Sequence, residues 1–102
     1  MHLIQILLPL YDENGESFSS GHCSVIRKEL ADKFGGITTY TRSPAVGLWK
    51  ETENKTVRDE IIIFELMIAE VDELWWSNYK IGLEKLFKQD IIVIRSWEIT
   101  LL

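Results

Sequence analysis

One acidic side chain stands where acidic side chains are costly. Glu65 lies within the mostly apolar segment Glu60 to Ile68. A carboxylate in such surroundings destabilises a fold unless a donor or an opposite charge accompanies it. Gln5, in the apolar N-terminal run, should share this face on the neighbouring strand, and either Arg42 or Arg95 can supply that partner. Glu65 is then a polar anchor or general base in a ligand site, or else part of a structural ion pair or the rim of an interface.

Two aromatic residues near Arg42 could complete such a site. Tyr40 and Arg42 alternate, so a strand would place both side chains on one face. Trp49 stands in a largely polar excursion, where it is either a lid or stacking platform over a ligand or the anchor of its own loop. The candidate ligand-binding residues are Gln5, Tyr40, Arg42, Trp49, Glu65 and Arg95, and Glu65 is the only candidate for catalysis.

Other familiar chemistries have no residues to support them. His2 and His22 are the only histidines, and neither has a second ligand at metal-binding spacing, so we expect no metal site. Cys23 is the only cysteine, which excludes an intramolecular disulfide and a cysteine cluster. The sequence has no catalytic triad pattern and no glycine loop that could cradle a nucleotide phosphate. We therefore expect no cofactor.

Composition narrows the class of protein. The chain has 102 residues, which suits a single domain spanning 1–102, and 46% of them are hydrophobic. Its net charge of −5 and the lack of a basic stripe argue against nucleic acid as a partner. No apolar run approaches the roughly 20 residues that a membrane helix needs. The lone cysteine and the lack of a basic leader predict a reducing, cytoplasmic location.

The positions of these residues depend on six predicted elements. Apolar and β-branched runs predict strands, and apolar residues recurring every four positions predict helices, with Ser19 or Ser20 and Asp72 as N-caps. Ser43-Pro44-Ala45 should end the second strand, with a short continuation at 47–50. The expected strands are 3–8, 37–42, 60–68 and 91–101, and the expected helices are 19–34 and 72–88.

The order β-α-β-β-α-β predicts the fold. Right-handed crossovers convert this order into a split βαβ sheet with strand order 4-1-3-2, the ferredoxin-like arrangement of the α+β class. Both helices then lie on one face of an antiparallel sheet. The first and third strands, which are the most apolar, take its centre.

These two central strands are apolar on both sides. Ile62, Phe64, Leu66 and Ile68 can face the helices, but Ile61, Ile63 and Met67 flank Glu65 on the opposite side. A helix-free face should instead be polar. Such a patch is rarely left in water, because its burial is worth about 25 cal/mol per Å². We expect a homodimer with its sheets face to face; the alternative is that segment 43–58 folds over the face.

The chain also resembles a known sequence pattern. The matching residues are Phe34-Gly35-Gly36-Ile37-Thr38, then Arg42, Pro44, Gly47 and Trp49, and later Phe87-Lys88-Gln89-Asp90. This pattern is similar to that of an uncharacterised family of short bacterial proteins. The resemblance implies a ferredoxin-like, dimeric domain of unknown function, and it carries over no catalytic residue.

Three functions fit these observations. The first is a dimeric small-molecule-binding or sensor module with its pocket on the open sheet face. The second is a cofactor-free isomerase or monooxygenase-like enzyme, with Glu65 as base and Arg42 or Arg95 holding an anion. The third is a protein-interaction module whose open face docks another chain.

Overall fold

The predicted fold is confirmed. The computed structural model describes residues 1–12, 14–18, 20–52 and 55–102, with side chains described for 1–12, 14–18, 21–40 and 60–102. The elements are β1 (His2–Pro9), α1 (Ser20–Phe34), β2 (Thr38–Thr52), β3 (Lys55–Ile68), α2 (Glu73–Leu86) and β4 (Ile94–Glu98). The sheet order β2-β3-β1-β4 is the predicted 4-1-3-2 order read from the other edge, and every strand pair is antiparallel.

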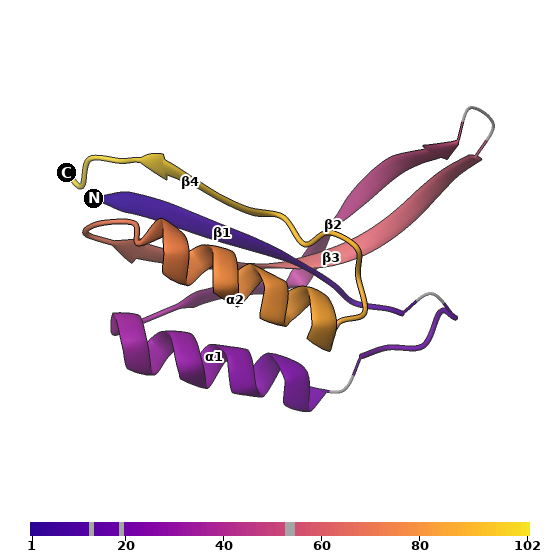
Figure 1. Ribbon diagram of the computed structural model, residues 1–102, viewed down its shortest axis with the longest axis horizontal. Coiled ribbons are helices and arrows are strands. Elements are labelled where there is room, and N and C mark those ends of the chain that lie inside the picture. The colour runs from indigo at the N-terminus through magenta and orange to yellow at the C-terminus, as the bar shows by residue number, and fades with distance from the viewer. Residues whose placement is uncertain (13, 19, 53–54) are drawn as a thin grey trace.

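Both helices cover the same face of the sheet, and the other face carries no helix (Figure 1). Alternation along the central strands points one set of side chains toward the helices. The buried side chains on this side are Ile4, Ile6, Leu8, Ile26, Leu30, Ile62, Phe64, Leu66, Ile68, Trp76, Leu83, Phe87 and Ile92. The core therefore lies wholly between the sheet and the helix layer.

The second helix faces the core differently from the expected pattern. The predicted cap is present, since the Oδ1 atom of Asp72 accepts from the backbone N–H of Trp75 at 3.1 Å. Trp76 is buried and stacks on Phe34, whereas Trp75 is half-buried and stacks on Tyr79. Leu86 is exposed, and the helix ends there instead of at residue 88. The inward face is thus rotated toward Trp76.

The predicted break at Pro44 is wrong. β2 is one strand from Thr38 to Thr52, and its pairing with β3 shifts register between Tyr40 and Ala45. This irregularity takes up the extra residues of β2, and it tolerates a proline because no ladder hydrogen bond there needs the N–H that proline lacks. The prediction failed because a strand can pass through a proline in this way.

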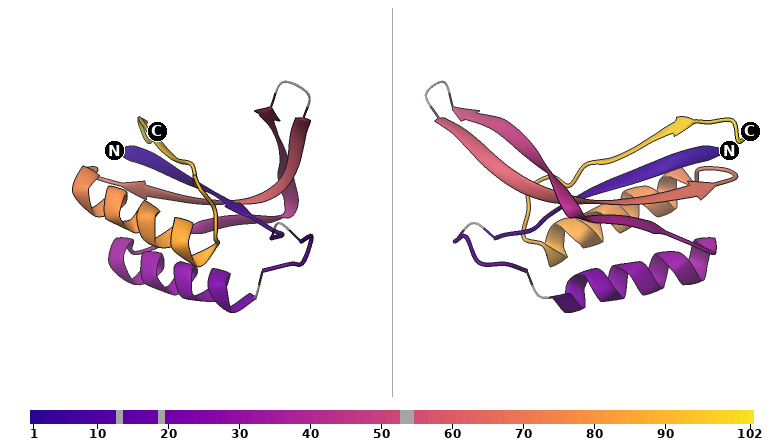
Figure 2. Two further views of the ribbon diagram at one scale, coloured as in Figure 1. Left: turned by 45° about the vertical axis from the view of Figure 1, so that its right-hand side comes forward. Right: turned by 180° about the vertical axis from the view of Figure 1, so that it is seen from behind.

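Beyond the bulge, β2 and β3 continue as a long hairpin. It extends past the body of the domain and rises on the helix-free side (Figures 1 and 2). It stands beside the helix-free face and does not lie over it. The described backbone of this hairpin, residues 43–52 and 55–58, therefore does not fold across the face, contrary to the alternative expectation.

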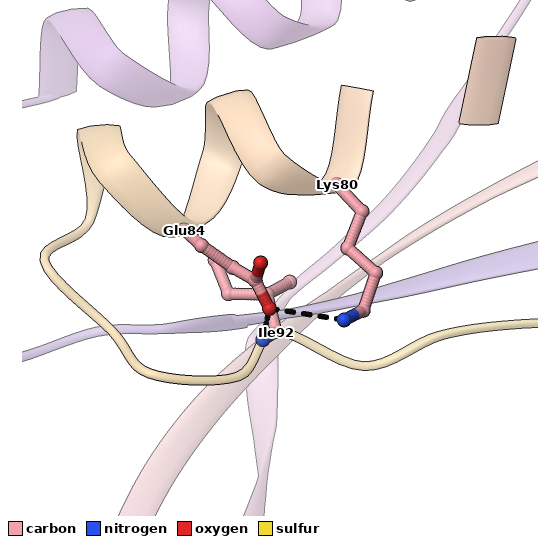
Figure 3. Close-up of polar contacts among 3 residues, drawn as sticks. All are labelled: Lys80, Glu84 and Ile92. Carbon is pink, nitrogen blue, oxygen red and sulfur yellow. Dashed lines mark hydrogen bonds and ion pairs between the residues drawn. The ribbon is translucent and has the colours of Figure 1, made fainter. Parts of the chain in front are cut away.

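The last strand is shorter than predicted, because the chain before it is held by α2. Ile92 is buried, and its backbone N–H donates to the Oε2 atom of Glu84 at 3.0 Å in place of a strand neighbour. Lys80 donates to the same oxygen at 3.0 Å (Figure 3). β4 consequently begins at Ile94, and the backbone of Ile99 returns to bond Met1, so the two ends of the chain lie side by side.

Candidate functional site on the helix-free face

A row of hydrogen bonds crosses all four strands on the helix-free face. The hydroxyl of Tyr40 on β2 donates to Oε2 of Glu65 on β3 at 3.0 Å. The Nε2 atom of Gln5 on β1 donates to Oε1 of the same carboxylate at 2.8 Å. The Nε atom of Arg95 on β4 donates to Oε1 of Gln5 at 3.0 Å. We call these four residues the polar row.

The strand register builds the polar row. Gln5 lies opposite Glu65 on one side and opposite Arg95 on the other. Directly paired residues in neighbouring strands share a face, so these three side chains must meet. Tyr40 pairs with Ile63, one same-face position away from Glu65, and its long side chain leans along the sheet to reach the carboxylate.

Each member of the row orients the next. Both oxygens of Glu65 accept a bond from a neighbouring strand, and the Gln5 amide passes the contact on to Arg95. The hydrogen bond to Glu65, and then the negative charge of that carboxylate, raise the pKa of the Tyr40 phenol. Tyr40 is therefore a neutral donor at ordinary pH, and Glu65 is a fixed acceptor.

Apolar side chains surround the polar row. Leu3 and Leu7 of β1 and Ile61 and Ile63 of β3 are half-buried without any helix above them. The largest side chains of the face remain open: Tyr40 is 47% exposed, Met67 52% and Trp97 43%. A few convergent polar groups on an apolar floor are typical of sites that recognise small molecules.

The arrangement can hold a ligand more readily than it can abstract a proton. A carboxylate oxygen offers two lone pairs, so each oxygen of Glu65 can accept one bond beyond those from Gln5 and Tyr40. The guanidinium of Arg95 uses only Nε in the row. The Glu65 carboxylate and the Arg95 guanidinium are thus both available to a bound molecule. Gln5 and Tyr40 hold the carboxylate in place.

The structure brings together four of the six candidate residues, Gln5, Tyr40, Glu65 and Arg95. The side chains of Arg42 and Trp49 lie outside the described residues. Trp49 pairs with Val57 in the outer hairpin, roughly 26 Å of strand from Glu65 at about 3.3 Å per residue. The predicted excursion carrying Trp49 over the face is therefore replaced by a strand that leads away from it.

One hollow was not predicted from the sequence. A groove of about 280 Å³ lies between α2 and β4, on the helix side of the sheet edge, and its lining includes Trp76, Ser77, Lys80 and Ser96. Lys80, the lysine of α2 that lines this groove, forms an ion pair with Glu84. The one signal in the sequence is Ser96, a polar residue at a position of β4 that pairs with the buried Ile4.

Two further classes of site have no counterpart in the part of the chain that the structure describes. No group of three His, Cys, Asp or Glu residues there is arranged to hold a metal ion. No helix among the described residues has the length and apolar character needed to cross a bilayer.

Comparison with known proteins identifies the fold and no family. No family model matches the chain, and no curated protein matches it. Among solved structures, it is similar to a phage SAM lyase in complex with S-methyl-5′-thioadenosine, with a TM-score of 0.65 and 11% identity over 95% of this chain and 80% of that one.

Two further solved structures are similar to the chain. One is the divalent cation tolerance protein CutA1 from Thermus thermophilus, with a TM-score of 0.60 and 14% identity over 97% of this chain and 84% of that one. The other is CutA from Pyrococcus horikoshii, with a TM-score of 0.58 and 13% identity over 100% and 87%. Likeness at such low identity establishes the ferredoxin-like fold alone.

Proposed function

We propose that this chain is a small-molecule-binding module that acts as a homodimer and holds its ligand on the helix-free face, against the polar row. The observation that carries this proposal is the continuous Tyr40–Glu65–Gln5–Arg95 network within a field of apolar side chains. Each cross-strand hydrogen bond on such a face contributes only about 1 kcal/mol to stability, and it requires that long side chains be ordered. The cost of ordering them is consistent with a role in recognition.

The surroundings of the row suggest the chemistry of the ligand. Glu65 accepts hydrogen bonds, so the ligand should present hydroxyl or amino donors to it. Trp97 offers a flat aromatic surface to a ring, and Ile63 offers apolar contact to a hydrocarbon body. Nucleosides combine both features, and a carboxylate is the usual protein partner of a ribose hydroxyl.

The fold likeness supplies a first probe. The phage SAM lyase was solved with S-methyl-5′-thioadenosine, a nucleoside with ribose hydroxyls and an apolar thioether. This chain shares that fold, so the same compound is a rational starting ligand for the helix-free face. The lone, half-buried Cys23 supports a reducing compartment such as a bacterial cytoplasm as the place of action.

The held carboxylate favours binding over the enzymatic alternative. Gln5 and Tyr40 each occupy one lone pair on an oxygen of Glu65 and fix the carboxylate in place, and the remaining lone pairs can accept hydrogen bonds from the donors of a ligand. The geometry therefore supports an anchoring carboxylate.

The test is a titration of the wild-type protein and Glu65→Gln with S-methyl-5′-thioadenosine, adenosine and a panel of amino acids, followed by calorimetry and melting temperature. A charge-assisted hydrogen bond is worth about 1.5–3 kcal/mol, so the substitution should weaken binding about 10- to 100-fold. Glu70→Gln is the matched control, because Glu70 is exposed and lies beyond the end of β3. Equal binding by wild type and Glu65→Gln, or no binding by any compound, would contradict the proposal.

A further inference from the structure

The polar row is incomplete at its cationic end. Arg95 donates only its Nε atom, to Gln5, and its two terminal nitrogens have no partner among the residues that the structure describes. The guanidinium is built for bidentate pairing with a carboxylate. In its own row, Gln5 separates Arg95 from Glu65, the only carboxylate of the row. Among the described residues, the two terminal nitrogens of Arg95 are therefore open to a carboxylate from a second molecule.

The helix-free face is large enough to bind another copy of the chain. β1 has eight residues, so the centre of the face is about 26 Å long at about 3.3 Å per residue, and the face narrows toward its edges because β4 has five residues and β2 pairs only at Thr38–Tyr40 before its register shift. Two such faces would bury somewhat less than about 1,000 Å² between them, the size of a weak interface. The apolar side chains on the face are of the kind that such an interface buries.

Two copies can stack face to face about either of two simple two-fold axes, and the charges of the polar row favour one of them. A two-fold axis running along the row would set Glu65 against the partner's Glu65 and Arg95 against the partner's Arg95. Like charges in direct opposition are destabilising. A two-fold axis parallel to the strands, between β1 and β3, reverses the row instead. It sets Glu65 against the partner's Gln5 and Arg95 against the partner's Tyr40.

The second arrangement also satisfies the unpaired guanidinium. Because β4 lies next to β1 in the sheet, the partner's Arg95 stands only one strand spacing, about 4.8 Å, to the side of Glu65. Stacked sheets lie about 10 Å apart, which is within reach of an arginine and a glutamate extended toward each other. Leu3, which pairs with Met67 in its own sheet, then faces the partner's Met67, so that apolar side chains meet apolar side chains.

We infer that a second copy covers the helix-free face about this axis and that the partner's Arg95 pairs with Glu65. The inference rests on the proposed function for the place of the ligand, and it makes each ligand site a shared one. Glu65 and Tyr40 come from one copy, the guanidinium from the other. Each dimer holds two such sites, one beside each β2 edge, where the hairpin rises (Figure 2). A ligand with a donor group and an anionic group would bridge the two copies.

The test is a mixing experiment with two charge-reversed variants, E65K and R95E, followed by light scattering and sedimentation without ligand. Wild type should have twice the protomer mass of 11.9 kDa. Each variant alone places like charges together at both contacts and should dissociate at least 10-fold more readily. An equimolar mixture should recover the dimer, because each contact then joins opposite charges across the two copies.

Several outcomes would overturn the inference. They are a wild type that is monomeric or has three times the protomer mass, variants that dimerise as tightly as wild type, and a mixture that stays monomeric. Melting curves of each variant establish that it folds, and E70K, a charge reversal outside the face, should leave the dimer intact. Binding of S-methyl-5′-thioadenosine is measured separately, so failure of the dimer and failure of ligand binding are distinguishable.

Discussion

The two faces of the sheet are built from the same strands and differ in what covers them. On the helix side, Phe64 is fully buried beneath α1 and α2. On the other side, Met67, three residues further along the same strand, is half exposed. Both faces are rich in apolar side chains, but among the described residues the row of hydrogen-bonded polar side chains lies on the uncovered face alone. Apolar alternation therefore identifies both surfaces as ones that favour burial, and the polar row distinguishes the helix-free face from the helix-covered one.

The largest expected loss of stability comes from a substitution on the helix-covered face. Phe64→Ala should lower the free energy of unfolding by about 3–5 kcal/mol, because it leaves a cavity that the packed helices cannot fill. Met67→Ala should change it by less than about 1 kcal/mol when measured at a concentration at which the chain is monomeric. Urea denaturation of both variants measures the difference. Equal losses would mean that the two faces are equally buried in one protomer.

An intermediate effect concerns the connection between α2 and β4. The Ile92 N–H and then Lys80 lower the pKa of Glu84, so this carboxylate stabilises the fold above its ordinary pKa of about 4.5. That contribution is lost as the pH falls through the lower pKa of the folded state. Glu84→Gln should reduce the melting temperature at pH 7 by less than Phe64→Ala does, and the gap from wild type should close as the pH falls through the lowered pKa of Glu84. A gap that persists or widens in acid would refute the assignment.

The smallest effect tests the polar row itself. Glu65 raises the pKa of the Tyr40 phenol, so in alkaline titration Tyr40 should ionise above the ordinary value of about 10. Stability linked to this phenol is present below that value and is lost as the pH rises through the raised one. Glu65→Gln removes the charge and should bring the Tyr40 transition back down, which difference absorbance against Tyr40→Phe can isolate. An unchanged transition would mean that the two side chains do not meet in solution.

The sequence was sufficient to predict the fold and most of the site because both follow from strand alternation and topology. Once Gln5, Glu65 and Arg95 lie on adjacent strands with the correct parity, the register brings them together. The fate of Pro44 was not predictable in this way, because a bulge depends on how the partner strand accommodates extra residues. The late start of β4 was also missed, since it depends on Glu84 reaching Ile92 from another element.

The groove between α2 and β4 escaped prediction for a similar reason. Its lining comes mainly from α2 and β4, which are separate in the sequence and adjacent only in the folded chain. No local sequence pattern therefore predicts it. The two tryptophans show the limit of helical periodicity. Adjacent residues differ by about 100° around the axis, so Trp75 and Trp76 cannot both face the core: Trp76 is buried, Trp75 is half-buried, and Phe34 contacts both rings.

An NMR titration of the wild-type protein with S-methyl-5′-thioadenosine, observing the side-chain amide of Gln5 at the middle of the polar row, decides whether the helix-free face binds the ligand. If it does, the largest shifts occur at this amide and along the helix-free positions of β1 and β3. Shifts confined to Ser77, Lys80 and Ser96 around the groove, with the Gln5 amide unmoved, would contradict binding at that face.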